Sequence, residues 1–249
     1  MIIYKTDKEI EEMRESCQLA ASVLKFIEPH IQAGITTNEI NDLCHSYILE
    51  KGATPSPLNY RGFPKSICTS VNQVVCHGIP SSYQLRDGDI VGVDVTTFFK
   101  GYHGDTCKTF SVGKSSRSAR ELLKSAEEAL WIGIEAARTG THLGDIGAAI
   151  QKFVEAKGYS VVREYCGHGI GKNFHEDPHV VHFGKKGTGP QLKPGMVFTI
   201  EPMINAGKAD IVLLKDNWTV ETQDKKLSAQ FEHTVALTSD GLKILTELA

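Results

Sequence analysis

The sequence predicts a single α+β domain made of two similar halves, in which an antiparallel sheet is covered by helices. Three observations predict this class. Each half opens with two amphipathic helical patterns, each half continues into apolar strand patterns, and the two halves keep nearly the same register. The predicted domain spans residues 1–249, with halves at approximately 1–113 and 114–249.

The first half begins with two predicted helices. Thr6 and Glu9 have the spacing of a capping box, in which each side chain bonds the backbone amide of the other residue, and an apolar stripe follows. Thr36 and Glu39 repeat this spacing before a second stripe. That helix should end at Gly52, because glycine readily adopts the left-handed conformation that terminates helices.

The second half repeats this order of elements. Ser118 and Glu121 are expected to cap a third helix, and a fourth should end at Gly158. At a constant offset of 106, the correspondences are Gly34 with Gly140, Ile40 with Ile146, and Gly52 with Gly158. The strands that lead to Asp94 and Glu201 correspond at an offset of 107. Coincidence among helix-ending glycines is the alternative, but the combined alignment favours a duplication and a site on the pseudo-twofold axis.

Composition and charge narrow the class of protein. The net charge of −3 gives no basic face, so we expect no specific nucleic-acid partner. No apolar run approaches the ~18 residues that cross a bilayer, and the charged start of the chain lacks the apolar core of a signal peptide. We therefore expect a cytoplasmic protein without membrane association. Its six cysteines match no zinc or redox spacing and are expected to be mostly buried thiols.

Two aspartates lie in neighbouring apolar strands. Asp94 lies in the first strand, and Asp105 follows a predicted turn at Lys100–Gly101, so the hairpin places the carboxylates roughly opposite each other, within a residue or two of register. Like charges across a sheet destabilise it unless a cation lies between them. A lone Asp at a strand end is more often a turn former, but the apolar flanks and the hairpin favour a cation site.

Two glutamates and a histidine complete the candidate site. Glu201 follows an apolar strand in the place that Asp94 occupies in the first half, and Glu232 lies in another apolar strand. Buried ionised carboxylates must be paired or bound to metal, and no Lys or Arg stands at matching inner-strand positions, so metal is a simpler partner than buried salt bridges. His168 on its own would more often be structural, but it adds one nitrogen ligand to four carboxylates.

One segment matches a zinc-protease motif without the structural context that the motif needs. Residues His175–His179 satisfy the His-Glu-x-x-His pattern. That pattern requires a helix, so that both histidines share a face, whereas residues 167–174 are rich in glycine and Pro178 would interrupt the helix. We therefore reject a helical zinc site here.

Five segments carry these residues and their neighbours in a specific order. They are Val75–Pro80, Gly101–Thr106, Cys166–Gly171, Phe198–Pro202 and Leu227–Thr234. In order and separation, over nearly the whole chain, they resemble the type I methionine aminopeptidases in their bacterial form, which lacks a zinc-binding N-terminal extension. The resemblance implies the pita-bread fold. It also implies a dinuclear metallo-hydrolase that removes the N-terminal initiator methionine from nascent proteins and prefers a small second residue.

The resemblance implies a role for each candidate residue. Two divalent metal ions (Co, Mn, Fe or Zn) would be held by Asp94, Asp105, His168, Glu201 and Glu232, with Asp105 and Glu232 bridging. A metal-bridging hydroxide would attack the scissile carbonyl, with Glu201 as the general base. His175 would stabilise the oxyanion and His77 would contact the peptide nitrogen near the leaving group, so both would also bind substrate.

A methionine pocket and a monovalent-cation site follow from the same resemblance. The pocket would be lined by Tyr60, Phe63, Cys68, Phe174 and Trp218, since thioethers pack well against aromatic edges. Taken alone, each aromatic residue is more simply explained as core. One Na or K ion would be bound at Asn72, Val74 and Ser228. The sequence departs from many relatives at Arg61 and from some at Pro57, which concerns the rim of the pocket rather than the ligands.

Two alternatives remain open. A proline-directed peptidase such as prolidase shares the fold but usually carries an added N-terminal domain, for which this chain has no room. A metal-free binding module is disfavoured because all five ligand positions are filled. The expected partners are the N-terminal Met of nascent polypeptides and, transiently, the ribosome, although the sequence shows no docking element for it. A monomer is the expected oligomeric state.

Overall fold

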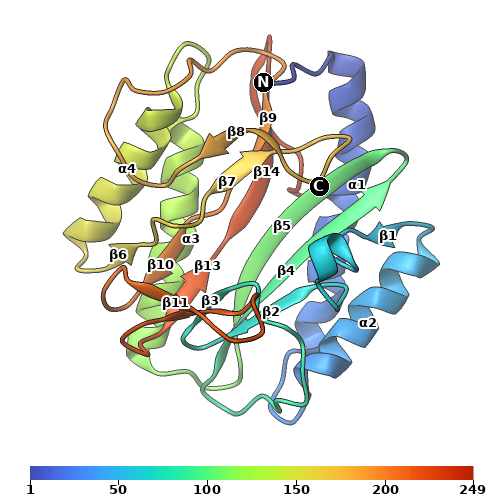
Figure 1. The fold of residues 1–249 in the computed structure, drawn as a ribbon, viewed down its shortest axis with the longest axis vertical. Helices are drawn as coiled ribbons and strands as arrows, with labels where there is room; N and C mark the ends of the chain where they lie inside the picture. The colour runs from blue at the N-terminus through green and yellow to red at the C-terminus, as the bar shows by residue number, and fades with distance from the viewer. Residues whose placement is uncertain (249) are drawn as a thin grey trace.

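The computed structural model describes residues 1–248 and has the predicted α+β fold (Figure 1). The helices are α1 (Asp7–Ile27), α2 (Thr37–Glu50), α3 (Arg117–Ala136) and α4 (Leu143–Ala156), with short 3-10 helices at Glu28–His30 and Tyr60–Gly62. The strands are β1 (Thr54–Pro55), β2 (Cys68–Val71), β3 (Val74–Cys76), β4 (Ile90–Phe99), β5 (Tyr102–Ser111), β6 (Ser160–Val161), β7 (Gly167–Gly169), β8 (Glu176–Val180), β9 (Val197–Ile200), β10 (Met203–Asn205), β11 (Ile211–Leu213), β12 (Val220–Thr222), β13 (Ser228–Gln230), β14 (Glu232–Thr238) and β15 (Gly241–Ile244).

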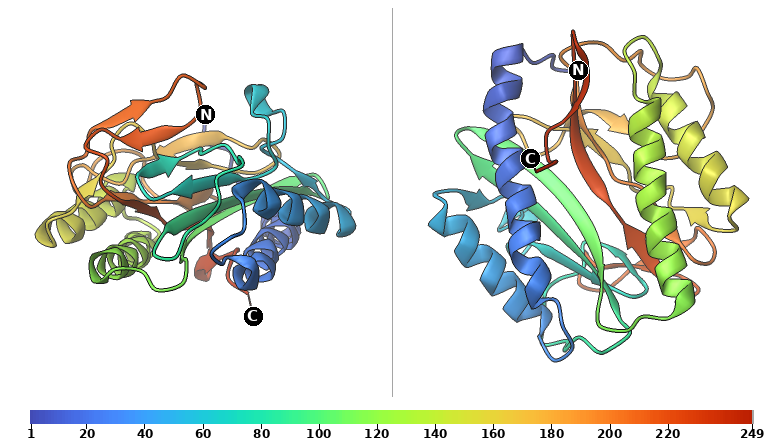
Figure 2. Two further views of the ribbon diagram at one scale, coloured as in Figure 1. Left: turned by 90° about the horizontal axis from the view of Figure 1, so that it is seen from below. Right: turned by 180° about the vertical axis from the view of Figure 1, so that it is seen from behind.

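A nine-stranded antiparallel sheet forms the centre of the molecule. Its order is β1-β4-β5-β14-β9-β7-β8, with β2 paired to β4 and β15 paired to β14, and two three-stranded sheets, β13-β10-β6 and β11-β12-β3, adjoin it. Figure 2 shows the long helices α1 and α3 on the same face of this sheet, with strands visible between them, α2 outside α1 and α4 outside α3. The opposite face is free of these helices and holds the candidate site. None of the helices within residues 1–248 combines the length and apolar character needed to cross a membrane.

The same hydrogen bond recurs in both halves at the predicted offset. The backbone N–H of Gly34 donates to the carbonyl of Leu85 at 2.8 Å, and that of Gly140 donates to Leu192 at 2.9 Å. Both glycines have positive φ, 101° and 90°, which explains why glycine stands at each position. The sequence offset of 106–107 therefore corresponds to a repeated structural unit.

The helix starts follow local sequence signals, with one exception. Both α1 and α2 begin with the predicted capping boxes. The box predicted at Ser118 and Glu121 is wrong. Ser116 caps α3 instead, because its hydroxyl accepts the N–H of Ala119 at 3.1 Å, and Glu121 forms an ion pair with Arg117.

The helix α1 packs directly onto the strand that carries Asp105. Gly104 precedes Asp105 in β5, and a Cβ at this position would lie 2.4 Å from the backbone nitrogen of Cys17. Ser16 adds a buried hydrogen bond from its hydroxyl to the carbonyl of Thr97 in β4, at 2.9 Å. This close contact fixes the β4–β5 hairpin against α1 and thereby sets the position of the candidate site.

Candidate metal centre and substrate cavity

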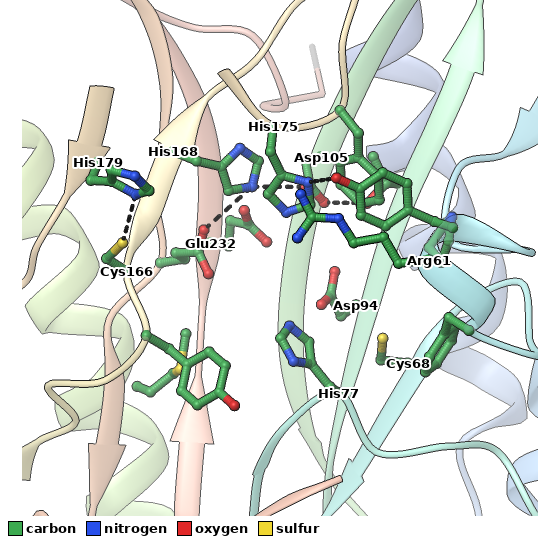
Figure 3. Close-up of a pocket in the computed structure, with 18 of the residues that line it drawn as sticks. Arg61, Cys68, His77, Asp94, Asp105, Cys166, His168, His175, His179 and Glu232 are labelled. Atoms are coloured by element: carbon green, nitrogen blue, oxygen red, sulfur yellow. Dashed lines mark hydrogen bonds and ion pairs between the residues drawn. The ribbon is translucent and has the colours of Figure 1, made fainter. Parts of the chain in front are cut away.

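A cavity of about 570 Å³ opens on the face of the sheet opposite α1 and α3 (Figure 3). Its walls include all the residues predicted as metal ligands, catalytic histidines and methionine pocket: Tyr60, Phe63, Cys68, His77, Asp94, Asp105, His168, Phe174, His175, Glu201, Trp218 and Glu232. These residues come from both halves of the chain. The cavity therefore lies where the halves meet.

The β4–β5 hairpin presents two carboxylates on one face. The turn at Lys100–Gly101 forms as predicted, with φ of 51° and 89°. In the register of the hairpin, Asp94 pairs with Cys107 and Thr96 pairs with Asp105, so the two aspartates are two residues apart across the strands and share a face. The hydroxyl of Thr96 donates to Asp105 Oδ1 at 2.7 Å and holds this carboxylate in place.

His168 in β7 offers a free ring nitrogen to these carboxylates. Its Nδ1 lies 2.9 Å from the carbonyl of Gly169, which only an N–H can satisfy, so the neutral ring carries its proton on Nδ1. Its Nε2 lies 3.6 Å from Asp105 Oδ2 and 3.8 Å from Glu201 Oε1. A backbone bond that orients the ring in this way is typical of a metal-binding histidine.

The two glutamates come from the second half of the chain. Glu201 directly follows β9, and its carboxylate accepts the hydroxyl of Thr199 at 2.7 Å and the amide of Gln230 at 3.1 Å. Glu232 is the first residue of β14 and is 3% exposed. Its Oε1 is buried and has no hydrogen-bond partner among the described residues. A buried carboxylate oxygen without a partner is unfavourable, which indicates that it binds a ligand.

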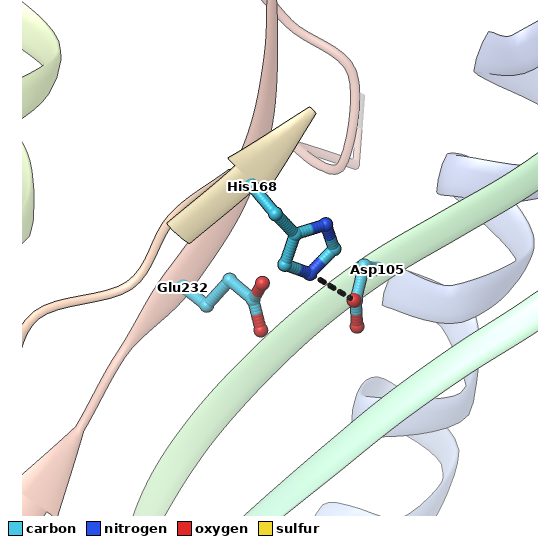
Figure 4. Close-up of side chains that lie close together, drawn as sticks. All are labelled: Asp105, His168 and Glu232. Atoms are coloured by element: carbon cyan, nitrogen blue, oxygen red, sulfur yellow. Dashed lines mark ion pairs between the residues drawn. The ribbon is translucent and has the colours of Figure 1, made fainter. Parts of the chain in front are cut away.

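The centre of the cluster has the composition of a divalent-cation site. One ligand atom from each of Asp105, His168 and Glu232 lies within 4.8 Å of the others (Figure 4). Along residues 1–248, His168 is the only basic side chain within 4 Å of the four carboxylates. Carboxylate oxygens with one imidazole suit ions such as Mn, Fe, Co or Zn. The donor set and the unsatisfied oxygen of Glu232 therefore fit a metal.

Without a cation, three of the acids in the cluster have raised pKa values, because they are buried close to one another. Burial raises the pKa of Glu201 to about 7, against the opposing effect of His168. Burial and the neighbouring carboxylates raise the pKa of Asp94 and of Glu232 well above their ordinary values. Burial lowers the pKa of His168, but its interactions with Asp105 and Glu201 outweigh burial and raise it overall. A bound cation would relieve this repulsion.

Two further histidines line the cavity, on either side of Asp94 in the view of Figure 3. Burial lowers the pKa of His77 to about 4 and that of His175 to about 3, so both rings are neutral near pH 7. His175 Nδ1 lies 2.9 Å from the hydroxyl of Tyr60. The next residue, Glu176, forms a buried ion pair with Lys5 that anchors this segment to the start of the chain.

Aromatic side chains form the apolar wall. Phe63 meets Trp218 edge to face at 5.1 Å, and Tyr60 packs against Phe174 at 4.9 Å. Cys68 is the cross-strand neighbour of Asp94, so this thiol lines the cavity next to a carboxylate. Together they make a slot suited to one apolar side chain beside the candidate metal centre.

Arg61 and Pro57, the two positions at which the resemblance implies a departure, also line the cavity. Arg61 adopts a left-handed backbone conformation with φ of 48°, and its guanidinium lies 5.3 Å from the ring centroid of Tyr60. Pro57 precedes this turn. Among the described residues, neither forms a hydrogen bond or an ion pair with the four carboxylates or with His168.

The segment His175–His179 does not form a helical zinc motif, as the sequence indicates. Glu176–Val180 is strand β8, so the two histidines do not share a helix face. His179 lies beside Cys166 instead, with Nδ1 3.5 Å from Sγ.

The three residues of the predicted monovalent-cation site lie near one another. The backbone N–H of Ser228 donates to the carbonyl of Asn72 at 2.9 Å, and Val74 begins the adjacent strand β3. A carbonyl oxygen has two lone pairs and can therefore accept a second partner besides the N–H of Ser228.

Sequence reasoning missed the residues that hold Glu201. Thr199 lies two residues before Glu201, whereas the contact of Gln230 with Glu201 depends on the pairing of β13 with β10, which follows Glu201 in the chain. His182 is 1% exposed, and its Nε2 accepts the backbone N–H of Glu201 at 3.1 Å. No local pattern marks His182, because the contact forms between segments that the fold brings together.

Comparison with known proteins identifies the family. Residues 11–239 match the metallopeptidase family M24. The chain is 52% identical to methionine aminopeptidase of Escherichia coli K12, covering 98% of this chain and 94% of that protein, and 56% identical to methionine aminopeptidase A of Synechocystis, covering 96% and 95%. The crystal structure of methionine aminopeptidase from Rickettsia prowazekii matches with a TM-score of 0.98 at 52% identity, covering 99% of this chain and 100% of that one. The chain therefore belongs to metallopeptidase family M24, has its pita-bread fold, and is similar over nearly its whole length to bacterial methionine aminopeptidases.

Proposed function

We propose that this protein is a metal-dependent aminopeptidase that removes the N-terminal initiator methionine from nascent proteins. The observation that carries the proposal is the meeting of Asp105, His168 and Glu232 in a cavity that also has an aromatic slot. The similarity to methionine aminopeptidases supports it. The carboxylates and imidazole account for hydrolysis, and the slot accounts for selection of an apolar first residue.

Two divalent ions would be held by Asp94, Asp105, His168, Glu201 and Glu232, with Asp105 and Glu232 shared between them. When bound, such ions supply a Lewis acid and lower the pKa of a bound water. The protein fixes the donor atoms through Thr96, Thr199, Gln230 and the carbonyl of Gly169.

Glu201 is the proposed general base. Burial raises its pKa to about 7 in the protein without a cation, so its carboxylate is a stronger proton acceptor than an exposed glutamate. Its two hydrogen-bond donors, Thr199 and Gln230, hold the carboxylate in one orientation. It therefore accepts the proton of the attacking water and passes it to the leaving amine.

The neutral histidines complete the proposed machinery. If Tyr60 donates its hydroxyl hydrogen to His175 Nδ1, the proton of the neutral ring lies on Nε2, from which it can be donated to the developing oxyanion. His77, also neutral, is proposed to contact the peptide nitrogen near the leaving group. Neutral rings suit these roles because they donate a hydrogen bond without adding a positive charge to a site for cations.

The remaining proposals concern binding. The methionine side chain would occupy the slot of Tyr60, Phe63, Cys68, Phe174 and Trp218, and we propose a preference for a small second residue. One Na or K ion would be bound by Asn72, Val74 and Ser228, close to the small sheet that adjoins the cavity.

Peptide hydrolysis tests the proposal. The protein supplied with Mn, Fe, Co or Zn should release Met from Met-Ala and Met-Gly peptides, and should leave X-Pro peptides intact. Release from X-Pro peptides alone would favour a proline-directed peptidase. His168→Ala should abolish release while leaving the fold largely intact, and a fully active variant would refute the ligand assignment.

A further inference from the structure

The strands that carry Asp105 and Glu232 come from different halves and are only briefly paired. β5 and β14 share two register pairs, Glu232 with Cys107 and His233 with Thr106. Beyond them, neither strand continues the ladder with the other, and β14 pairs with β9 on its other side. Something other than an extended backbone ladder must therefore fix the distance between these two residues.

Two buried threonine hydroxyls join the strands at this point. Thr106 Oγ1 in β5 donates to the carbonyl of Glu232 at 2.8 Å, and Thr234 Oγ1 in β14 donates to the carbonyl of Asp105 at 2.7 Å. The two bonds are reciprocal, since each ends on the backbone of a proposed shared ligand in the opposite strand. Both side chains are at most 2% exposed. We call these two bonds the threonine cross-ties.

The cross-ties join neighbouring residues of the two strands in both directions. Side chains alternate along a strand, so Thr106 lies on the face opposite Asp105, toward α1 and α3. Because one bond runs from β5 to β14 and the other from β14 to β5, together they resist sliding of one strand along the other. The carboxylates on these strands are thereby held at one separation.

The end of the chain supports the same junction from behind. Thr246 Oγ1 accepts the backbone N–H of Thr234 at 3.2 Å and lies 2.8 Å from His233 Nδ1. Gln18 of α1 donates to the carbonyl of Leu245 at 2.8 Å. The Leu245–Thr246 segment therefore ties β14 to α1 directly behind the cavity.

We propose that Thr106 and Thr234 are positioning residues that set the separation of Asp105 and Glu232 and so tune the affinity for divalent metal. This inference rests on the metal centre proposed above. Without a cation the two carboxylates repel, and the cross-ties keep their strands from moving apart. Bonds that orient metal ligands typically change metal affinity by about 10–100-fold when removed.

Isosteric variants test this role. Thr106→Val and Thr234→Val remove the hydroxyl and keep the shape of the side chain. Thr106→Ser and Thr234→Ser keep the hydroxyl. Thr238→Val is the matched control, because the Thr238 hydroxyl in the same strand donates to Gly241 at the β14–β15 turn instead. The measurements are the Kd for Mn²⁺ of the metal-free protein by titration calorimetry, the free energy of unfolding in urea, and kcat and KM with a Met-Ala-Ser peptide.

The Val variants should raise the Kd for Mn²⁺ about tenfold or more, and they should lower kcat more than they change KM. The Ser variants should largely restore both the Kd and kcat. Thr238→Val should bind Mn²⁺ as the wild type does. Val variants that are merely less stable but bind Mn²⁺ normally would overturn the proposal. If one Val variant does not fold, the other decides by the same criterion. A wild type that binds Mn²⁺ but releases no methionine would instead refute the proposed function, since the Kd comparison does not depend on turnover.

Discussion

At the residue scale, the acids of the cavity make the metal-free protein sensitive to pH. The folded chain holds protons on Asp94, Glu201 and Glu232 more tightly than the unfolded chain, because burial raises all three pKa values. A raised pKa stabilises the fold at low pH, and this contribution is lost as pH rises through the folded pKa. Buried neutral histidines such as His182, with a pKa of about 3, have the opposite effect, but it is complete above about pH 6.5.

The metal-free protein should therefore lose stability between about pH 6.5 and about pH 7.5, as the pH passes through the folded pKa of Glu201 at about 7 and the buried histidines no longer oppose the trend. Saturating Mn²⁺ should reverse the trend, since metal binds the deprotonated acids and only the folded site. Urea unfolding at the two pH values, with and without Mn²⁺, measures both effects. A metal-free protein that becomes more stable over this range would contradict the assignment of buried, mutually repelling acids.

His175 provides a second test at this scale. His175→Ala should lower kcat by about 100-fold with little change in the Kd for Mn²⁺, because the ring is proposed to donate to the oxyanion and is not a proposed ligand. His179→Ala is the control, since His179 lies in the same segment beside Cys166. Steady-state kinetics on a Met-Ala-Ser peptide separate the two. Equal losses in both variants would point to general damage to β8 rather than to a catalytic role.

At the element scale, the sequence predicted the helix starts and turns that depend on a few adjacent residues. The capping boxes of α1 and α2 and the Lys100–Gly101 turn were predictable because each depends on a few adjacent residues. The predicted start of α3 was wrong by two residues. Ser116 and Ser118 both satisfy the N-cap preference, and the sequence alone does not decide between them. The insertion of β14 between β5 and β9 has no local signal, which is why the threonine cross-ties were not predicted. The contact of His182 joins the segment after β8 to the end of β9 and likewise has no local signal.

The packing of α1 on β5 gives a prediction for a whole element. Gly104→Ala would place a Cβ 2.4 Å from backbone of α1 and should destabilise the fold by about 1–3 kcal/mol, while weakening metal binding through the adjacent Asp105. Gly92→Ala in β4 is the control, because its Cβ would meet nothing closer than 3.5 Å. Urea unfolding gives the comparison. Equal stability of the two variants would show that α1 can move away without cost.

At the scale of the whole molecule, the site is assembled from residues of both halves of the chain. The first half supplies Asp94 and Asp105 on one hairpin, and the second half supplies Glu201 and Glu232 at the ends of β9 and β14. Sequence patterns could identify these carboxylates because acids in apolar strands are unusual. Their convergence on one cavity depended on the pairing of the two halves, which the repeat offset indicated but did not specify.

The most direct test of the account is metal content together with methionine release, measured on the same preparation before and after chelation. The account predicts about two divalent ions per chain and release of Met from a Met-Ala-Ser peptide, both lost on chelation and both restored by added metal. Release that continues unchanged in fully metal-free protein would contradict it, because the five side chains would then have no cation to hold.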